Sequence, residues 1–329
     1  MKIAQFGLGP IGLETLKLAA SKPWADSVGA IDIDPHKIGK DLSHLTGHRS
    51  LRRRLVYPSI DDLLKHAKPD LIFHTAVSKF HAAFDQIEPI VRRGINVVSS
   101  CEELLFPQFR DPRLAARLDK ICRRSGARVV GTGVNPGFVM DLLPICLTSV
   151  CRDVRSITVH RVVDASTRRE PLQRKIGSGL APQEFLRRFR KGTIGHAGLR
   201  DSLALIGHCL GWRLDKISET GEPVVAKCHI RTQFLVVVKR GQACGLHQRA
   251  IGRENGRVRL TLDLKMYLDA PDPHDRVQIQ GDPPLDVLIR GGVAGDQATS
   301  AALVNAAPQL LLAPPGLRLI TELPAGHFA

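Results

Sequence analysis

The chain opens with a short apolar segment, residues 2–6, that runs directly into a glycine-rich turn. The turn has the spacing G-x-G-x-x-G and consists of Gly7, Leu8, Gly9, Pro10, Ile11 and Gly12. In such a turn the first glycine permits a tight bend, the second lets the backbone approach a pyrophosphate, and the third lets the next helix pack closely. The free N–H groups and the positive dipole end of that helix would face the phosphates. The opening therefore predicts a dinucleotide-binding site.

An acidic residue, Asp32, ends the second apolar segment, twenty residues after Gly12. An acid at this place accepts hydrogen bonds from ribose hydroxyls and repels the 2′-phosphate of NADP. Lys37 and the arginines at 52–54 could offset that repulsion. Because a strand precedes the turn, a helix follows it and an acid ends the next strand, a chance glycine turn is the less favoured interpretation. We expect the cofactor to be NAD or NADP, with a preference for NAD.

Strand and helix patterns alternate over the first 131 residues, as a parallel doubly wound sheet requires. Strands are expected at 2–6, 28–33, 70–75, 95–99 and 128–131. Helices are expected at 13–20, 60–66, 80–93 and 114–125. Open α/β sheets bind ligands beyond the carboxyl ends of their strands, and these strands end in small or polar residues. The cofactor site should therefore also include Thr75, Ala76, Val77, Ser100 and Asn135.

The pattern changes near residue 154 to longer stretches with a period of two, at 156–163, 226–239 and 257–268. Such stretches, interrupted by helical segments, favour a mixed or antiparallel sheet with helices on one face. A later segment, 295–308, is rich in small residues and is typical of a closely packed helix.

These patterns predict an α/β protein with two domains. The first is a Rossmann domain with a doubly wound parallel sheet, and the second is an α+β domain with a mixed sheet. The expected ranges are 1–136 for dinucleotide binding, 137–290 for substrate and dimer contacts, and 291–329 for a C-terminal helix and tail that return to the first domain.

Composition limits the class of protein. The chain has 329 residues, of which 43% are hydrophobic and 24% are charged, as is ordinary for a soluble globular protein. No signal-peptide pattern and no apolar run of about eighteen residues is present, so we expect a cytoplasmic protein with no membrane contact. The seven cysteines have no metal-ligand spacing, and we expect no metal.

The net charge of +15 raises the possibility of a nucleic-acid partner. However, the sequence carries no recognition-helix or RNA-binding signature, and its two Tyr and two Trp offer little for base stacking. A basic, solvated surface is the favoured interpretation, and no nucleic-acid partner is expected.

Two adjacent acids, Glu102 and Glu103, follow the strand at 95–99. A dehydrogenase that acts on an alcohol or an amine needs a group that moves a proton at the reacting carbon. A carboxyl group partly buried there would have a raised pKa suited to that task. The alternative is an acid that stabilises a helix N-terminus, and one of the two is expected to do so. Asn135 could bind the carboxamide or the substrate, or it could be a turn residue before Pro136.

Several segments together resemble one known family. They are 131–141, 160–175 and 195–199, followed by 99–103, 291–296, Ala298, Thr299, Asn305 and 315–317. With these motifs the chain closely resembles the 2,4-diaminopentanoate dehydrogenase family, which includes the native amine dehydrogenases. The resemblance covers essentially the whole chain.

This resemblance implies a fold similar to dihydrodipicolinate reductase, a homodimer, and NAD(P)-dependent, reversible oxidative deamination of a primary amine to a ketone and ammonia. By this resemblance the family's catalytic glutamate falls in the stretch Cys101-Glu102-Glu103, with Glu102 favoured over Glu103. Its carboxylate would bind ammonia or ammonium, take the proton lost during attack on the carbonyl and stabilise the iminium. The same resemblance places Asn135 and His196 in the substrate pocket, although His196 could equally be a buried structural histidine. Whether Arg168 or Arg169 recognises a substrate carboxylate stays open.

Two other functions compete with this one. The first is an NAD(P)-dependent alcohol, hydroxy-acid or semialdehyde dehydrogenase on the same scaffold, which would usually need a Lys or His base near the nicotinamide. The second is a non-catalytic NAD-sensing protein, which would bind the cofactor without turnover.

Overall fold

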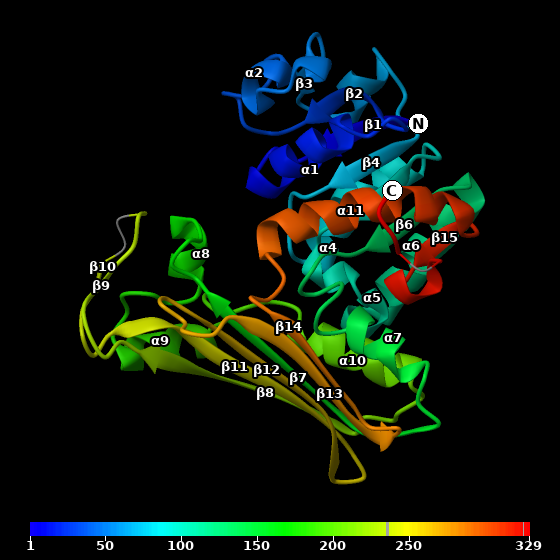
Figure 1. Cartoon of the computed structure of the whole chain (residues 1–329). Coiled ribbons are helices and arrows are strands. Elements are labelled where there is room, and N and C mark those ends of the chain that lie inside the picture. Colours follow the sequence, from blue (N-terminus) through cyan, green and yellow to red (C-terminus); the bar gives the residue numbers. More distant parts are fainter. Residues whose placement is uncertain (235–236, 325) are drawn as a thin grey trace. The chain divides into compact units, whose positions relative to one another are not determined.

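The computed structural model describes residues 1–234, 237–324 and 326–329 (Figure 1). The chain forms two compact units. The first unit comprises Met1–Phe138 and Ala294–Ala329, and the second unit comprises Val139–Val293. Each unit is described by itself.

The first unit is built on a seven-stranded parallel sheet with the order β15-β6-β5-β4-β1-β2-β3. Its strands are β1 (Lys2–Phe6), β2 (Asp26–Ile31), β3 (Val56–Tyr57), β4 (Leu71–His74), β5 (Asn96–Ser99), β6 (Arg128–Gly131) and β15 (Gly316–Arg318). The strand order reverses between β1 and β4, which is the switch point where such sheets bind dinucleotides beyond the carboxyl ends. The predicted Rossmann sheet is confirmed, and the five predicted strands differ from the observed ones by up to two residues at their ends.

Helices cover both faces of this sheet. They are α1 (Pro10–Ala20), α2 (Leu42–Thr46), α3 (Ile60–Leu64), α4 (Phe80–Val91), α5 (Pro107–Arg110), α6 (Pro112–Ser125) and α11 (Gly295–Leu312), with short 3-10 turns η1 (Arg49–Leu51), η2 (Glu102–Leu104) and η3 (Ile320–Glu322). Successive strand residues point to opposite faces. Val97 and Val129 therefore pack against α4 and α6, whereas Val98 and Val130 pack against α11. Burial on both faces explains why these strands are continuously apolar.

Two helix boundaries in the first unit differ from expectation by more than two residues. α1 begins at Pro10 rather than at residue 13, because Gly9 is its N-cap and proline suits the first helical position. α11 continues past Pro308 to Leu312, and Leu310 in this last turn is fully buried in the core. Tertiary packing thus outweighs the hydrogen bond that a proline removes.

The second unit contains a six-stranded sheet with the order β14-β13-β7-β12-β11-β8. Its strands are β7 (Asp153–Asp164), β8 (Lys216–Val225), β11 (Ala243–Glu254), β12 (Arg257–Tyr267), β13 (His274–Asp282) and β14 (Leu285–Arg290). β7 and β12 are parallel and the other neighbours are antiparallel, so the predicted mixed sheet is confirmed. The helices of this unit are α7 (Leu142–Thr148), α8 (Glu170–Lys175), α9 (Pro182–Arg190) and α10 (Leu199–Cys209).

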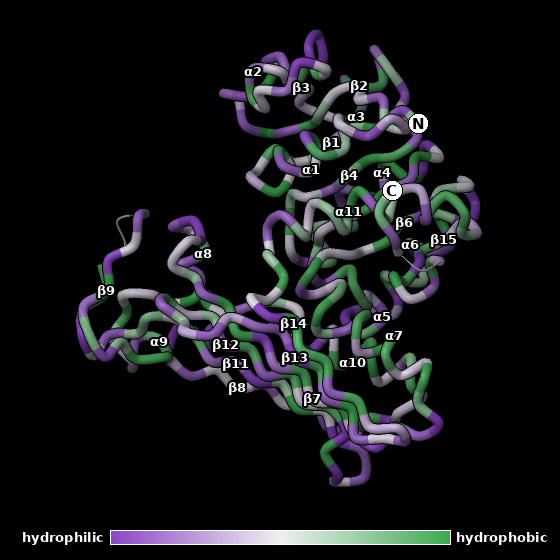
Figure 2. The backbone as a smooth tube through the Cα atoms, viewed as in Figure 1, coloured by the Kyte–Doolittle hydropathy of each residue, from purple (hydrophilic) through white to green (hydrophobic). Residues whose placement is uncertain are grey.

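Hydrophobic and hydrophilic residues alternate along these strands (Figure 2). On β12, for example, Leu260, Leu262 and Leu264 are fully buried, whereas Lys265 is exposed. α10 packs against β8, β11 and β12. The period-two pattern at 257–268 therefore indicated a half-buried strand correctly.

The strand predicted at 226–239 is wrong. β8 ends at Val225, and the described residues that follow it within this range form a two-residue ladder between β9 (Ile230–Arg231) and β10 (Val237–Val238). Residues 235 and 236 of that prediction lie outside the described residues. The apolar residues of this segment belong to two separate short strands, which a single period-two run cannot distinguish.

Candidate active site

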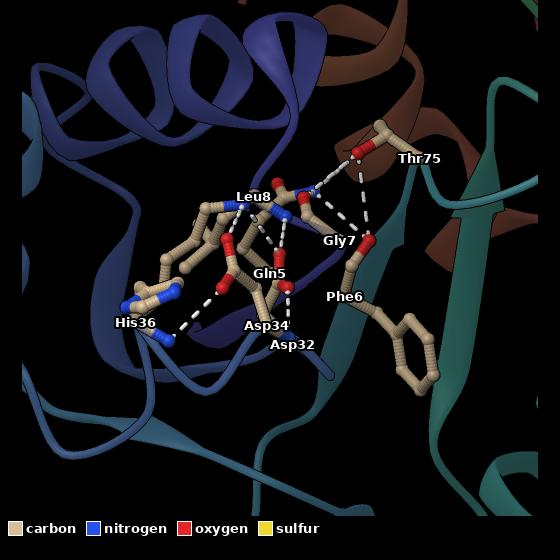
Figure 3. Close-up of polar contacts among 9 residues, drawn as sticks. Gln5, Phe6, Gly7, Leu8, Asp32, Asp34, His36 and Thr75 are labelled. Atoms are coloured by element: carbon tan, nitrogen blue, oxygen red, sulfur yellow. Dashed lines mark hydrogen bonds and ion pairs between the residues drawn. The ribbon is translucent and has the colours of Figure 1, made fainter.

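A small hydrogen-bond network fixes the glycine turn (Figure 3). The Gln5 Nε2 group donates to the Gly7 carbonyl at 3.1 Å and to the Thr75 hydroxyl at 2.9 Å. The Thr75 hydroxyl in turn donates to the Gly7 carbonyl at 3.0 Å. Gly7 has a φ of +88°, a conformation that favours glycine. The side chains of β1 and of the turn after β4 thereby hold the first glycine of the motif in place.

The other two glycines of the turn serve different purposes. A Cβ atom on Gly12 would lie 1.9 Å from the Gly7 carbonyl oxygen, so no other residue fits there without a shift of the backbone. A Cβ atom on Gly9 would have no atom within 4 Å. Gly9 is the N-cap of α1 and makes no side-chain cap. The open space beside it, at a helix N-terminus, fits the pyrophosphate of a dinucleotide.

Asp32 lies directly beside this turn (Figure 3). Its carboxylate accepts the Leu8 N–H at 2.6 Å and the Asp34 N–H at 2.9 Å. The Lys37 ammonium lies 3.5 Å from the same carboxylate. Asp32 is therefore held at the place where it can bind a ribose, with a cation already next to it.

We expected the arginines at 52–54 to lie near Asp32, but Arg54 binds another acid. The guanidinium of Arg54 pairs at 3.1 Å with Asp26, the first residue of β2, six positions before Asp32. Lys37 is the cation for which the structure provides a contact with Asp32. The offset of the 2′-phosphate repulsion would thus come from Lys37 rather than from Arg54.

Sequence reasoning missed Ile33, which it treated as the end of a strand. β2 ends at Ile31, and the Ile33 side chain is 86% exposed. This exposed apolar side chain, next to Asp32, offers a surface on which an adenine ring can pack, because burial against an aromatic base removes apolar surface from water. The available signal was an isoleucine directly after the acid, in a position that an apolar core does not need.

Glu103 binds the N-terminal end of α4. Its carboxylate accepts the Phe80 N–H at 2.9 Å and pairs with the Lys79 ammonium at 2.9 Å. Burial alone would raise the pKa of Glu103, but the hydrogen bonds from Lys79 and from the Phe80 N–H outweigh it and lower the pKa. The expectation of a raised pKa is therefore wrong for Glu103, and this residue fits the helix N-terminal alternative.

Glu102 is the first residue of η2 and is half-buried. The backbone on either side of it is fixed. The Cys101 N–H donates to the Ser99 hydroxyl at 3.1 Å, and the Glu103 N–H donates to the Ser78 carbonyl at 3.3 Å. Ser100 joins the same turn, because its N–H donates to the His74 carbonyl at 2.9 Å. Hydrogen bonds thus tie this turn to the ends of β4 and β5 and to the turn after β4.

Asn135 follows β6 in the same unit. Within the part of the chain that the structure describes, both polar atoms of its side-chain amide are buried and have no hydrogen-bond partner. A buried amide without partners is unfavourable by about 1–3 kcal/mol. Its donor and its acceptor match a carboxamide or another small polar ligand.

The two remaining candidates, His196 and Arg168, lie in the second unit. The amide of Gln248 binds both peptide groups of His196, at 2.9 Å to its N–H and 2.8 Å to its carbonyl. The amide of Gln173 donates to the Arg168 carbonyl at 2.7 Å. The Gly195 N–H donates to the Lys175 carbonyl at 3.0 Å, so the His196 loop contacts the C-terminal end of α8. Arg168 precedes the other end of the same helix.

Among the described residues, no group of three or more His, Cys, Asp and Glu side chains could hold a metal ion. In the same residues, no helix is long and apolar enough to cross a membrane.

Comparison with known sequences gives two kinds of match. The sequence profile of the 2,4-diaminopentanoate dehydrogenase C-terminal domain matches residues 138–328. A 2,4-diaminopentanoate dehydrogenase of Acetoanaerobium sticklandii is 29% identical over 330 residues, which cover 98% of this chain and 93% of that protein. An amine dehydrogenase of Streptomyces virginiae is 25% identical over 350 residues, which cover 97% of this chain and 95% of the relative.

Solved structures show a similar fold. An amine dehydrogenase from Mycobacterium smegmatis has a TM-score of 0.87 at 22% identity and covers 100% of this chain and 97% of that chain. A scyllo-inositol dehydrogenase from Lactobacillus casei, with bound NAD(H) and scyllo-inositol, has a TM-score of 0.55 at 16% identity and covers 92% of this chain and 86% of that chain.

Proposed function

The chain belongs to the 2,4-diaminopentanoate dehydrogenase family, and on that premise we propose that Glu102 manages the protons of a reversible oxidative deamination. The chain is an oxidoreductase that acts on the CH–NH2 group of an amine and uses NAD or NADP. The proposed substrate is 2,4-diaminopentanoate or a small aliphatic amine.

The reaction balances as ketone, ammonium, reduced coenzyme and one proton going to the protonated amine, oxidised coenzyme and water. When bound, the nicotinamide coenzyme supplies or accepts the hydride. The Glu102 carboxylate binds ammonium and takes a proton from its nitrogen, so that a lone pair can attack the carbonyl carbon. It returns that proton to the carbonyl oxygen and then carries a second proton from the nitrogen to the same oxygen, which leaves as water. Its negative charge stabilises the positive iminium, which is the species that receives the hydride.

The observation that carries this proposal is that the two neighbouring acids, Glu102 and Glu103, have different surroundings. Glu103 has both carboxylate oxygens engaged at the start of α4, at 2.9 Å from Lys79 and from the Phe80 N–H. Glu102 occupies the turn beyond the carboxyl end of β5, at the edge of the sheet where the coenzyme binds. Proton transfer therefore falls to Glu102 rather than to Glu103.

The coenzyme would be held by the glycine turn, by the acid after β2 and by the turns after β4, β5 and β6. The proposed contacts are Gly7, Gly9, Pro10, Ile11, Gly12, Asp32, Thr75, Ala76, Val77, Ser100 and Asn135. The unpaired amide of Asn135 supports a role toward the carboxamide or the substrate. His196 and Arg168 are proposed for the substrate side, in a domain that also makes the dimer contacts.

We further propose that the enzyme is a cytoplasmic homodimer, as the family resemblance implies. Light scattering coupled to size-exclusion chromatography should give about twice the chain mass of 36.0 kDa. A mass of one chain at micromolar concentration would contradict the dimer and leave the deamination chemistry untouched.

The test of the function is oxidation of NADH and NADPH with a panel of ketones, with and without high ammonium at alkaline pH. Oxidation that requires ammonium supports deamination. Oxidation that ignores ammonium identifies an alcohol dehydrogenase instead, and coenzyme binding without turnover on any ketone identifies a sensor.

A further inference from the structure

A chain of hydrogen bonds runs from α4 to the turn that carries Glu102. It begins at the Gln86 side chain on α4, whose Oε1 atom lies 2.8 Å from the His74 Nε2 atom. The other ring nitrogen of His74 lies 2.9 Å from the Ser99 hydroxyl. That hydroxyl accepts the N–H of Cys101 at 3.1 Å. His74 and Ser99 are fully buried, at the carboxyl ends of the neighbouring strands β4 and β5.

The direction of each bond follows from the partners. The Gln86 oxygen can only accept, so the His74 Nε2 atom must carry the proton. A neutral imidazole has one N–H, and the Nδ1 atom therefore accepts from the Ser99 hydroxyl. The Ser99 oxygen is left with lone pairs that face the Cys101 N–H. Burial lowers the pKa of His74 to about 4, although the hydrogen bond to the Gln86 oxygen raises it, so the ring is neutral at physiological pH.

Packing alone does not require these polar groups. Their neighbours in sequence, Phe73 on β4 and Val98 on β5, are apolar and fully buried in the core. Replacing buried polar groups by apolar ones is often neutral or stabilising, whereas a satisfied polar network fixes one arrangement. The arrangement fixed here is the backbone of Cys101, the residue directly before Glu102.

Glu103 fixes the backbone on the other side of Glu102. Its carboxylate ties η2 to Lys79 and Phe80, so Glu102 sits between two anchored neighbours. We propose that His74 and Ser99 are positioning residues for Glu102, which act on the reaction only through the geometry of the Cys101–Glu102 backbone. This inference rests on the proposed function of Glu102.

The first test removes the chain of hydrogen bonds through Gln86, His74 and Ser99, which we call the relay. Ser99→Ala and His74→Phe should lower kcat by about 10-fold to 100-fold, because misplacement of a reacting group by about 1 Å can slow a reaction 100-fold. The Kd for NADH should stay within about twofold, since no coenzyme contact is changed. Ser99→Thr keeps the hydroxyl and should restore most of the rate. The pH profile of kcat should shift in Ser99→Ala and return in Ser99→Thr.

A matched control lies at the opposite end of the same strand. Asn96 is also a buried polar residue of β5, and its amide bonds the Asp70 carbonyl and the Arg128 N–H. Asn96→Ala should lower the melting temperature but leave kcat and its pH profile unchanged. A fall in kcat of the same size in Asn96→Ala would show that the relay variants lose activity through a general loss of stability, and it would overturn the proposal.

Hydrogen exchange provides a readout that does not depend on turnover. The Cys101 N–H should exchange slowly in the wild type and in Asn96→Ala, and about fivefold faster or more in Ser99→Ala, where its hydrogen bond is lost. His74→Gln keeps a donor toward Gln86 but removes the acceptor for Ser99, and serves if His74→Phe does not fold.

Coupling to Glu102 decides the outcome. In a Glu102→Gln background, Ser99→Ala and His74→Phe should have no further effect on the residual rate, because the group they position is gone. An additional loss there, or full activity of both single variants, would overturn the relay. Full activity of Glu102→Gln itself would instead overturn the proposed function, so the two failures are distinct.

Discussion

The carboxylate of Glu103 accepts the backbone N–H of Phe80, the first residue of α4, at 2.9 Å. This contact joins two turns at the carboxyl edge of the parallel sheet, one after β4 and one after β5. It also separates the roles of two acids that are adjacent in the sequence, since Glu103 caps a helix while Glu102 is presented by the turn. The predictions below depend on that separation.

Glu103→Gln should destabilise the protein more than it impairs the reaction. The variant loses the ion pair with Lys79 and weakens the cap on α4, which together should lower the free energy of unfolding by about 1–2 kcal/mol. Thermal unfolding with and without NADH measures this, and kcat should stay within about tenfold of wild type. Loss of all turnover in a folded Glu103→Gln enzyme would show that the two acids have been assigned in the wrong order.

Gly9→Ala and Gly12→Ala should separate coenzyme binding from folding. A Cβ atom on Gly9 enters open space, so the melting temperature should hold while the Kd for NADH rises by about tenfold or more. A Cβ atom on Gly12 would lie 1.9 Å from the Gly7 carbonyl oxygen, so this variant should lose stability as well. Unchanged NADH affinity in Gly9→Ala would place the phosphates elsewhere.

Lys37 should control the choice between the two coenzymes. Lys37→Ala should lower the affinity for NADPH relative to NADH by about fivefold or more, because the uncompensated Asp32 carboxylate then repels the 2′-phosphate. Arg54→Ala is the matched control, since this arginine pairs with Asp26, and it should leave the ratio unchanged. The ratio of kcat/KM values for the two coenzymes measures the effect. Equal shifts in both variants would count against a specific role for Lys37.

His74 should make the protein sensitive to mild acid. Its pKa is about 4 in the folded chain against an ordinary value near 6.5, so the unfolded state binds the proton more readily. The stability contributed by the neutral ring is complete above pH 6.5 and is lost as the pH falls toward 4, by an amount on the order of 3 kcal/mol. Urea unfolding of the wild type and of His74→Phe at pH 7 and pH 4.5 measures the difference. Parallel losses in both proteins would indicate that other groups cause the acid sensitivity.

Local signals in the sequence predicted the sheet of the first unit, and they are the basis of its proposed coenzyme contacts. The glycine turn and Asp32 were predictable because each depends on residues within one β-α-β segment. The assignment of Glu102 and Glu103 was not, because it depends on a contact with Phe80, 23 residues away. The same holds for Asn135, whose unpaired amide becomes apparent only from its burial in the structure.

The second unit was harder to predict for a different reason. β11 carries Gln248 on its buried face, where a period-two pattern calls for an apolar residue. That glutamine is buried because its amide makes hydrogen bonds with both peptide groups of His196, as a neighbouring strand would. A hydropathy pattern does not reveal a buried polar side chain that binds a loop, and β11 was therefore not predicted.

The most direct test of the account compares Glu102→Gln with the wild type in ammonium-dependent oxidation of NADH by a ketone, with the NADH Kd measured on the same samples. We predict a loss of about 100-fold to 10,000-fold in kcat, the range that a positioned proton-transfer group supplies, at an NADH Kd within about twofold of wild type. A Glu102→Gln enzyme that turns over at the wild-type rate would contradict the account.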